Sequence, residues 1–156
     1  MAAILTVVRR WRSDSGAELI EFALAFPLLL LVVLGIVDFG FLFQRYEVIT
    51  NAAREGARIA ALPDYQANLA ANVGDRVNQY LDGAGMTDLG RSVSVVPSTV
   101  VVGGFCVSTY TVTVTYPHSF SFVGGIASYF GGTLGRSSLT ATSTMRAEAA
   151  VGACGP

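Results

Sequence analysis

The sequence predicts an α+β fold in which one long N-terminal helix packs on a small antiparallel β-sheet. Two patterns support this prediction. An apolar run without charge extends from Phe22 to Val37 and continues, past Asp38, to Phe43. Further along the chain, segments alternate threonine with apolar residues, which is typical of strands whose two faces meet different surroundings.

The composition fits one membrane segment followed by one modest domain. The chain has 156 residues, of which 52% are hydrophobic and only 13% charged, whereas soluble domains have about 25% charged residues. The net charge is −1. Because nucleic-acid binding requires a basic surface, no nucleic-acid partner is expected.

The apolar run predicts a transmembrane helix over residues 17–43, in contact with membrane lipid. The 22 residues from Phe22 to Phe43 are enough to cross a hydrocarbon core of about 30 Å as a helix. A secretory signal peptide has a shorter apolar core of about 7–15 residues, followed by small residues. This run instead ends in the bulky stretch Phe39–Phe43, so we expect a retained single-pass anchor.

The flanking charges favour an N-terminus inside the cell and a C-terminal domain outside. Arginines flank the span on both sides, so the positive-inside rule alone gives nearly a tie. The arginines of residues 9–12 are not mixed with glutamates, whereas Glu47 and Glu55 accompany those downstream. Cys106 and Cys154 lie in the threonine-rich region, which suits an oxidising exterior.

The helical pattern continues beyond the span as an amphipathic segment over residues 44–62. Glu55 and Arg58 are spaced for an i,i+3 ion pair, and Pro63 predicts the end of the helix because the residue before a proline avoids the α region. One side of the segment is small and apolar, so another backbone can approach closely. This stripe consists of Ile49, Ala53, Gly56, Ala57 and Ala60.

Residues 63–156 predict an extracytoplasmic α+β head domain. A second helix is expected over Tyr65–Leu81, with Leu69, Val73 and Val77 on one face. No structure is assigned to Phe120–Gly135. A small sheet with one apolar face needs a cover, which either the amphipathic segment or the second helix would supply.

Three strands are expected in the head. Ser92–Val102 and Phe105–Tyr116 flank Gly103-Gly104, a two-residue hairpin signal. Pro97 predicts that the first strand lies at an edge or contains a bulge. The third strand is expected over Leu139–Ala147.

The sequence predicts neither an enzyme nor a cofactor or metal site. No serine, histidine and carboxylate arrangement, phosphate loop or acid pair forms a recognisable motif. His118, the single histidine, is expected on a surface loop after the second strand. Cys106 is expected on the apolar face of that strand, either as a small buried side chain or in a disulfide with Cys154.

Glu21 is an unusual residue at the start of a membrane span, between Ile20 and Phe22. An acid at the first turn of a helix is one explanation, because the helix dipole favours negative charge there. The other is pairing, since a carboxylate near lipid is costly unless it has a partner. Cleavage after Gly16 would make Ala17 a new N-terminal amine, one helical turn from Glu21.

The N-terminal part of the sequence resembles a known protein family. The stretch GAELIEF is similar to the G-x-x-x-x-E-F processing site of type IV pilins and pseudopilins, and Gly16–Ala61 resembles the TadE family of pilin-like minor subunits. The shared features include Pro27, the Asp38-Phe-Gly40 stretch and the AREGAR run over Ala53–Arg58. The strand LTATSTMRAE at Leu139–Glu148 resembles the usual ending of the family.

The resemblance implies a pilin-like fold and a role for each matching residue. Residues 1–16 would be a leader peptide that a prepilin peptidase removes between Gly16 and Ala17. Glu21 and Phe22 would form the assembly and processing motif. Asp38 would be either an acid at the membrane interface or a contact with another subunit. Roles in helix packing or subunit contact are implied for Pro27, Asp38, Gly40, Ala53, Gly56 and Ala57.

The implied function is that of a minor pilin or pseudopilin that supports assembly or anchoring of Tad (Flp) type IV pili used for adherence. The implied location is the bacterial inner membrane, where the chain either remains or from which it enters a surface pilus. The implied partners are the prepilin peptidase, the major Flp pilin, a sibling minor pilin and the inner-membrane assembly platform. The alternative is a membrane-anchored extracytoplasmic binding domain outside any pilus.

Overall fold

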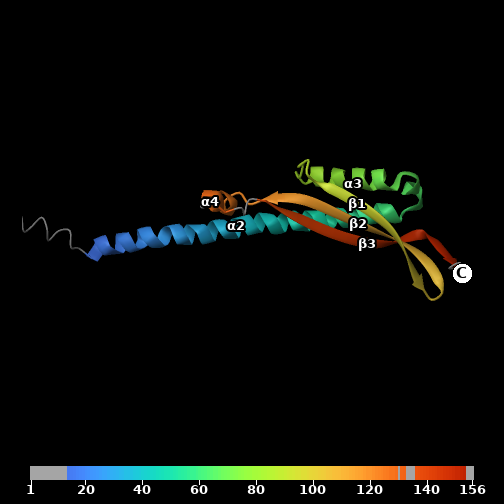
Figure 1. Cartoon of the computed structure of the whole chain (residues 1–156), viewed down its shortest axis with the longest axis horizontal. Helices are drawn as coiled ribbons and strands as arrows, with labels where there is room; N and C mark the ends of the chain where they lie inside the picture. Colours follow the sequence, from blue (N-terminus) through green and yellow to red (C-terminus); the bar gives the residue numbers. More distant parts are fainter. Residues whose placement is uncertain (1–13, 130, 133–135, 154–156) are drawn as a thin grey trace, which may run out of the picture.

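One long helix runs through the molecule, and the other elements gather along its second half (Figure 1). The computed structural model describes residues 14–129, 131–132 and 136–153. The helix, α2 (Asp14–Ala61), has 48 residues and packs on a three-stranded antiparallel sheet. The predicted α+β arrangement is therefore confirmed.

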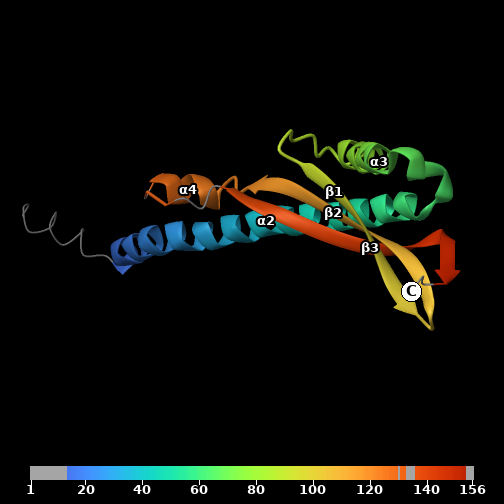
Figure 2. The ribbon, with the colours of Figure 1, turned by 45° about the vertical axis from the view of Figure 1, so that its right-hand side comes forward.

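The helical part of the head folds back along α2. Helix α2 ends at Ala61, just before Pro63 as predicted. A 3₁₀ helix, η1 (Pro63–Asn68), makes the turn, and α3 (Leu69–Gly83) follows it. The predicted α-helix from Tyr65 was therefore wrong in its first turn. Figures 1 and 2 both show α3 alongside the second half of α2.

The sheet has the strand order β1-β2-β3. Strand β1 (Ser92–Val102) has the predicted bounds and lies at an edge, where Pro97 is tolerated. Its register with β2 (Phe105–Ser119) runs without a shift, so the bulge alternative does not apply there. Strand β3 (Arg136–Ala153) starts earlier and ends later than predicted.

Both helices cover the same sheet, so the two covers considered from the sequence act together. Helix α2 contacts β2 and β3, and α3 contacts α2 and β1. The enclosed core includes Ile49, Val77 and Val112, which are fully buried. On β2, threonines alternate with this buried set and pair across to β3, as in the 2.9 Å contact between the hydroxyls of Thr111 and Thr144.

A fourth element lies in the segment that was left unassigned. Helix α4 (Val123–Tyr129) follows β2 and lies beside α2, on the N-terminal side of the sheet (Figure 1). Its sequence, VGGIASY, is rich in small residues, which explains why its hydrophobic pattern predicted no element.

Candidate functional site

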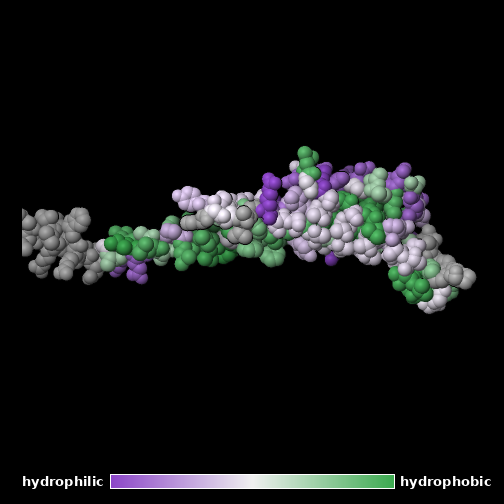
Figure 3. All heavy atoms as spheres, viewed as in Figure 1, coloured by the Kyte–Doolittle hydropathy of each residue, from purple (hydrophilic) through white to green (hydrophobic). Residues whose placement is uncertain are grey.

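The predicted processing and assembly residues lie on an exposed helical rod. Gly16, Ala17, Glu21 and Phe22 all belong to α2, and every residue from 16 to 33 is exposed. Figure 3 shows hydrophobic residues over much of this rod and more hydrophilic ones over the head. Within the described part of the chain, α2 is the one helix long and apolar enough to cross a membrane. It fits a single-pass anchor that carries a C-terminal domain.

The helical geometry places Ala17 and Glu21 on the same side of α2. They are four residues apart within one continuous helix, and residues at i and i+4 are neighbours on a helix surface. Glu18 is only three residues before Glu21 but directly follows Ala17, so it does not face Ala17. An amine at Ala17 would therefore lie beside the carboxylate of Glu21.

Pro27 and Gly40 are also on the exposed side of α2. Pro27 cannot donate a backbone hydrogen bond to the carbonyl of Ala23, yet the helix continues through it. A Cβ added at Gly40 would have no atom within 4 Å. Both positions therefore leave their surface open to lipid or to another chain.

Asp38 is the exception on this half of the helix because its side chain is only 2% exposed. Its carboxylate accepts backbone N–H bonds from Ser121 at 3.1 Å, Phe122 at 2.9 Å and Val123 at 2.7 Å. The first N–H groups of a helix lack partners within that helix. Asp38 therefore caps α4 and ties it to α2, a contact that neither sequence interpretation of Asp38 included.

The small-residue stripe of α2 packs inside the chain itself. Ala53 and Ala57 are fully buried. A Cβ added at Gly56 would lie 2.7 Å from Cγ2 of Val77 on α3 and 3.1 Å from Cγ1 of Val112 on β2. The close approach that the stripe predicted is thus made to α3 and β2 of the same chain.

Glu55 links the outer side of α2 to α3. Its carboxylate lies 2.8 Å from both the Arg58 and Arg76 guanidinium groups, which confirms the predicted pair with Arg58 and adds Arg76. Hydrogen bonds from Arg58 outweigh partial burial, and together with Arg76 they lower the pKa of Glu55 to about 2. The AREGAR run therefore supplies both an ion pair and the buried stripe.

His118 is buried in β2, with 2% exposure, so its prediction as a surface-loop residue was wrong. The strand continues to Ser119 and carries its alternation beyond Tyr116. Nη1 of Arg45 donates to Nδ1 of His118 at 3.1 Å, and a guanidinium can only donate, so the ring is neutral. Burial, and then the charge of Arg45, lower the pKa of His118, while Asp38 opposes them.

Cys106 does not lie on the buried face as predicted. Val107 is buried instead, while Cys106 is half-buried, and the register between β2 and β3 shifts between Val107 and Thr109. Backbone pairing sets Cys106 opposite Gly152 near the end of β3. Cys154 lies outside the described residues, so its disulfide with Cys106 stays a prediction. No cluster of metal-binding side chains occurs in the ranges that the structure describes.

The exposed rod and the buried stripe that follows it correspond to a known family. Residues 16–58 match the family described as TadE-like protein. This segment is TadE-like. The match confirms the resemblance over this part of the chain. No curated protein and no solved structure matches the chain. The TadE-like segment thus contains the rod, the acid Asp38 and most of the small-residue stripe.

Proposed function

We propose that this chain is a minor pilin or pseudopilin that a prepilin peptidase cuts between Gly16 and Ala17. After cleavage it supports the assembly or anchoring of Tad (Flp) pili used for adherence. The observation that supports this is the TadE-like rod, whose residues 16–33 are exposed along their whole length. An apolar helix of this length requires lipid or other apolar helices around it.

The rod has two environments in this proposal. In the bacterial inner membrane it is a single-pass anchor, with its N-terminus in the cytoplasm and the head outside. In a pilus, the same surface contacts the rods of the major Flp pilin and a sibling minor pilin, delivered by the assembly platform. Glu21 then pairs with the amine of Ala17, in its own or a neighbouring chain, because an unpaired carboxylate in apolar surroundings is costly.

Processing is tested by N-terminal sequencing and intact mass of the membrane-extracted protein, from cells with and without the prepilin peptidase. We expect a chain that begins at Ala17 only when the peptidase is present. A chain that begins at Met1 in both strains, or beyond Phe43, would overturn the proposal. The first result would favour the anchored binding domain, which needs no such processing.

The role of Glu21 in assembly is tested separately with Glu21→Ala. This variant should still be processed but should fail to support pili, as counted by electron microscopy of cells. Glu18→Ala is the matched control because Glu18 is an exposed acid on the same helix that does not face Ala17. Normal piliation in Glu21→Ala would remove the proposed role.

A further inference from the structure

We propose that Phe120–Tyr129, which includes α4, is a second membrane-contacting element, inserted beside α2 into the leaflet nearest the head. This inference rests on the membrane anchoring of α2 proposed above. According to this inference, part of the head contacts the bilayer. The element that Asp38 holds enters the lipid and fixes the head against the membrane.

The depth of α4 follows from the length of the span. A hydrocarbon core of about 30 Å requires about 20 helical residues. Counted from Phe22, the residue after Glu21, 20 residues end at Phe41. Helix α4 meets α2 within this stretch, because Val123 Cγ2 would lie 3.9 Å from a Cβ added at Gly35. Even a span that begins at Ala17 includes Gly35.

The surface of the segment suits lipid. None of residues 119–135 is charged, and the first charge after them is Arg136. Phe122 is 41% exposed and Tyr129 is 87% exposed, although both are aromatic. Aromatic side chains with a polar tip, such as tyrosine, concentrate at membrane interfaces.

Several polar groups of the segment make their hydrogen bonds within the protein, as a lipid environment requires. Backbone outside a regular helix is tolerated at membrane depth only where its hydrogen bonds are made within the protein. Asp38 accepts the N–H groups of Ser121 and Phe122, just before α4, and of Val123, its first residue. At the other end, the hydroxyl of Ser128 donates to the carbonyl of Gly125 at 2.8 Å. The N–H of Gly132 donates to the carbonyl of Ala127 at 2.7 Å.

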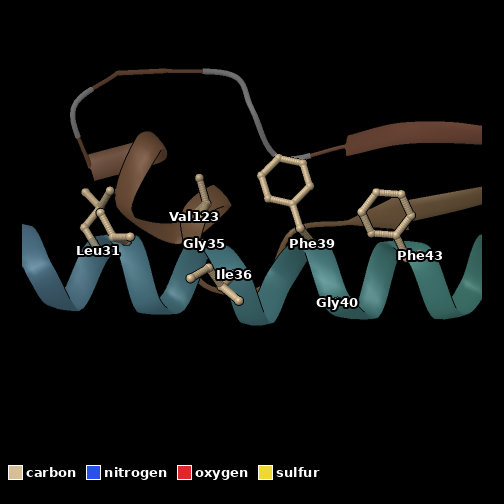
Figure 4. A pocket seen from close by; sticks show the side chains of 8 residues that line it. Leu31, Gly35, Ile36, Phe39, Gly40, Phe43 and Val123 are labelled. Atoms are coloured by element: carbon tan, nitrogen blue, oxygen red, sulfur yellow. The ribbon is translucent and has the colours of Figure 1, made fainter.

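An apolar groove continues this surface between α4 and α2. Figure 4 shows Val123 above Gly35, with Leu31 and Phe39 on either side along the helix. Ile36 and Gly40 also line the groove, so no charged side chain enters it. An acyl chain of a lipid in the same leaflet is the occupant that this lining and depth favour.

The test measures fluorescence quenching by brominated phosphatidylcholine in vesicles that contain the full chain. Trp11, the only tryptophan, is first replaced by phenylalanine, and single tryptophans are then introduced. Tyr129→Trp reports on the proposed element. Tyr65→Trp is the matched control, because it makes the same substitution in η1, beyond the far end of α2. Leu29→Trp is the reference inside the span.

We expect the bromolipid to quench Tyr129→Trp at least half as strongly as Leu29→Trp, and to leave Tyr65→Trp nearly unchanged. Phe122→Trp, at the other end of α4, should follow Tyr129→Trp. Quenching at Leu29 with none at either α4 position would overturn the inference and leave the anchor intact. That result would assign the α4 surface to a protein partner. Absence of quenching at Leu29 would overturn both the inference and the anchor.

Discussion

The two halves of α2 belong to one continuous helix but have opposite surroundings. Over residues 16–33 every side chain is exposed, although most are large and apolar. Over residues 49–61 the helix presents the small-residue stripe, whose Ala53, Ala57 and Ala60 are fully buried by the head. Along α2, the large apolar residues of the first half are therefore exposed, whereas the buried face of the second half consists mostly of alanine and glycine.

This difference separates the contacts that α2 makes within its own chain from those that require other molecules. The second half is fixed by its own head, because small residues allow α3 and β2 to approach closely. The first half has no cover within the described chain and requires lipid or other helices. Asp38 lies between the two halves, where its carboxylate ties α4 to α2.

The largest expected effect comes from enlarging the small stripe. Gly56→Val should lower the free energy of unfolding of the head by about 3 kcal/mol, because added methyl groups overpack a filled core and the first carbon already meets Val77 at 2.7 Å. Thermal unfolding in detergent, followed by near-ultraviolet circular dichroism, measures this change. Gly40→Val makes the same substitution on the exposed side and should change stability by no more than about 0.5 kcal/mol. Equal losses in the two variants would contradict the contrast between the halves.

Removing the acid at the boundary should have the next largest effect. Asp38→Ala leaves the N–H groups of Ser121, Phe122 and Val123 without their acceptor, so the docking of α4 should weaken by about 2 kcal/mol. Hydrogen–deuterium exchange of residues 121–129 should then become faster, while exchange in α3 stays unchanged. Glu21→Ala removes an exposed acid from the same helix and is the control. If both variants gave the same exchange, Asp38 would not hold α4.

The ion pair on the outer side of α2 should contribute less. Glu55→Gln should lower the free energy of unfolding by about 1 kcal/mol at neutral pH, since both arginines are partly exposed. The folded state lowers the pKa of Glu55 from 4.5 to about 2, so this contribution is present above pH 4.5. It is lost as the pH falls toward about 2. Denaturant unfolding across this pH range measures the free energy of unfolding. As the pH falls, this free energy should decrease less in Glu55→Gln than in Glu47→Gln, whose glutamate is exposed.

The smallest expected effect is the pH response of the buried histidine. The folded state lowers the pKa of His118 below 6.5, so the unfolded chain takes up a proton first and stability falls as the pH drops below about 6.5. The free energy of unfolding, measured with urea, should therefore differ more between pH 7 and pH 5.5 in the native chain than in His118→Gln. Because His118 is the only histidine, an unchanged difference would show that this ring does not cause it.

The sequence predicted most of the fold, because local patterns carry it. A 3.6-residue period and Pro63 indicated the extent and end of α2, and alternation around Gly103-Gly104 indicated β1 and β2. The Glu55–Arg58 pair was also predictable, since both residues lie on one helical turn. The resemblance to the TadE family was visible in the sequence, and the family match over residues 16–58 confirmed it.

The tertiary structure decided what joins distant parts of the chain. Asp38 meets Ser121–Val123, more than 80 residues away, so no local pattern could reveal its three hydrogen bonds or the position of α4. His118 lies within hydrogen-bond distance of Arg45, 73 residues earlier. Its burial depended on where β2 ends, which the sequence left three residues short. Periodicity thus indicated most of the helices and strands. Long-range packing determined how the carboxylate of Asp38, in the apolar part of α2, finds its hydrogen-bond donors.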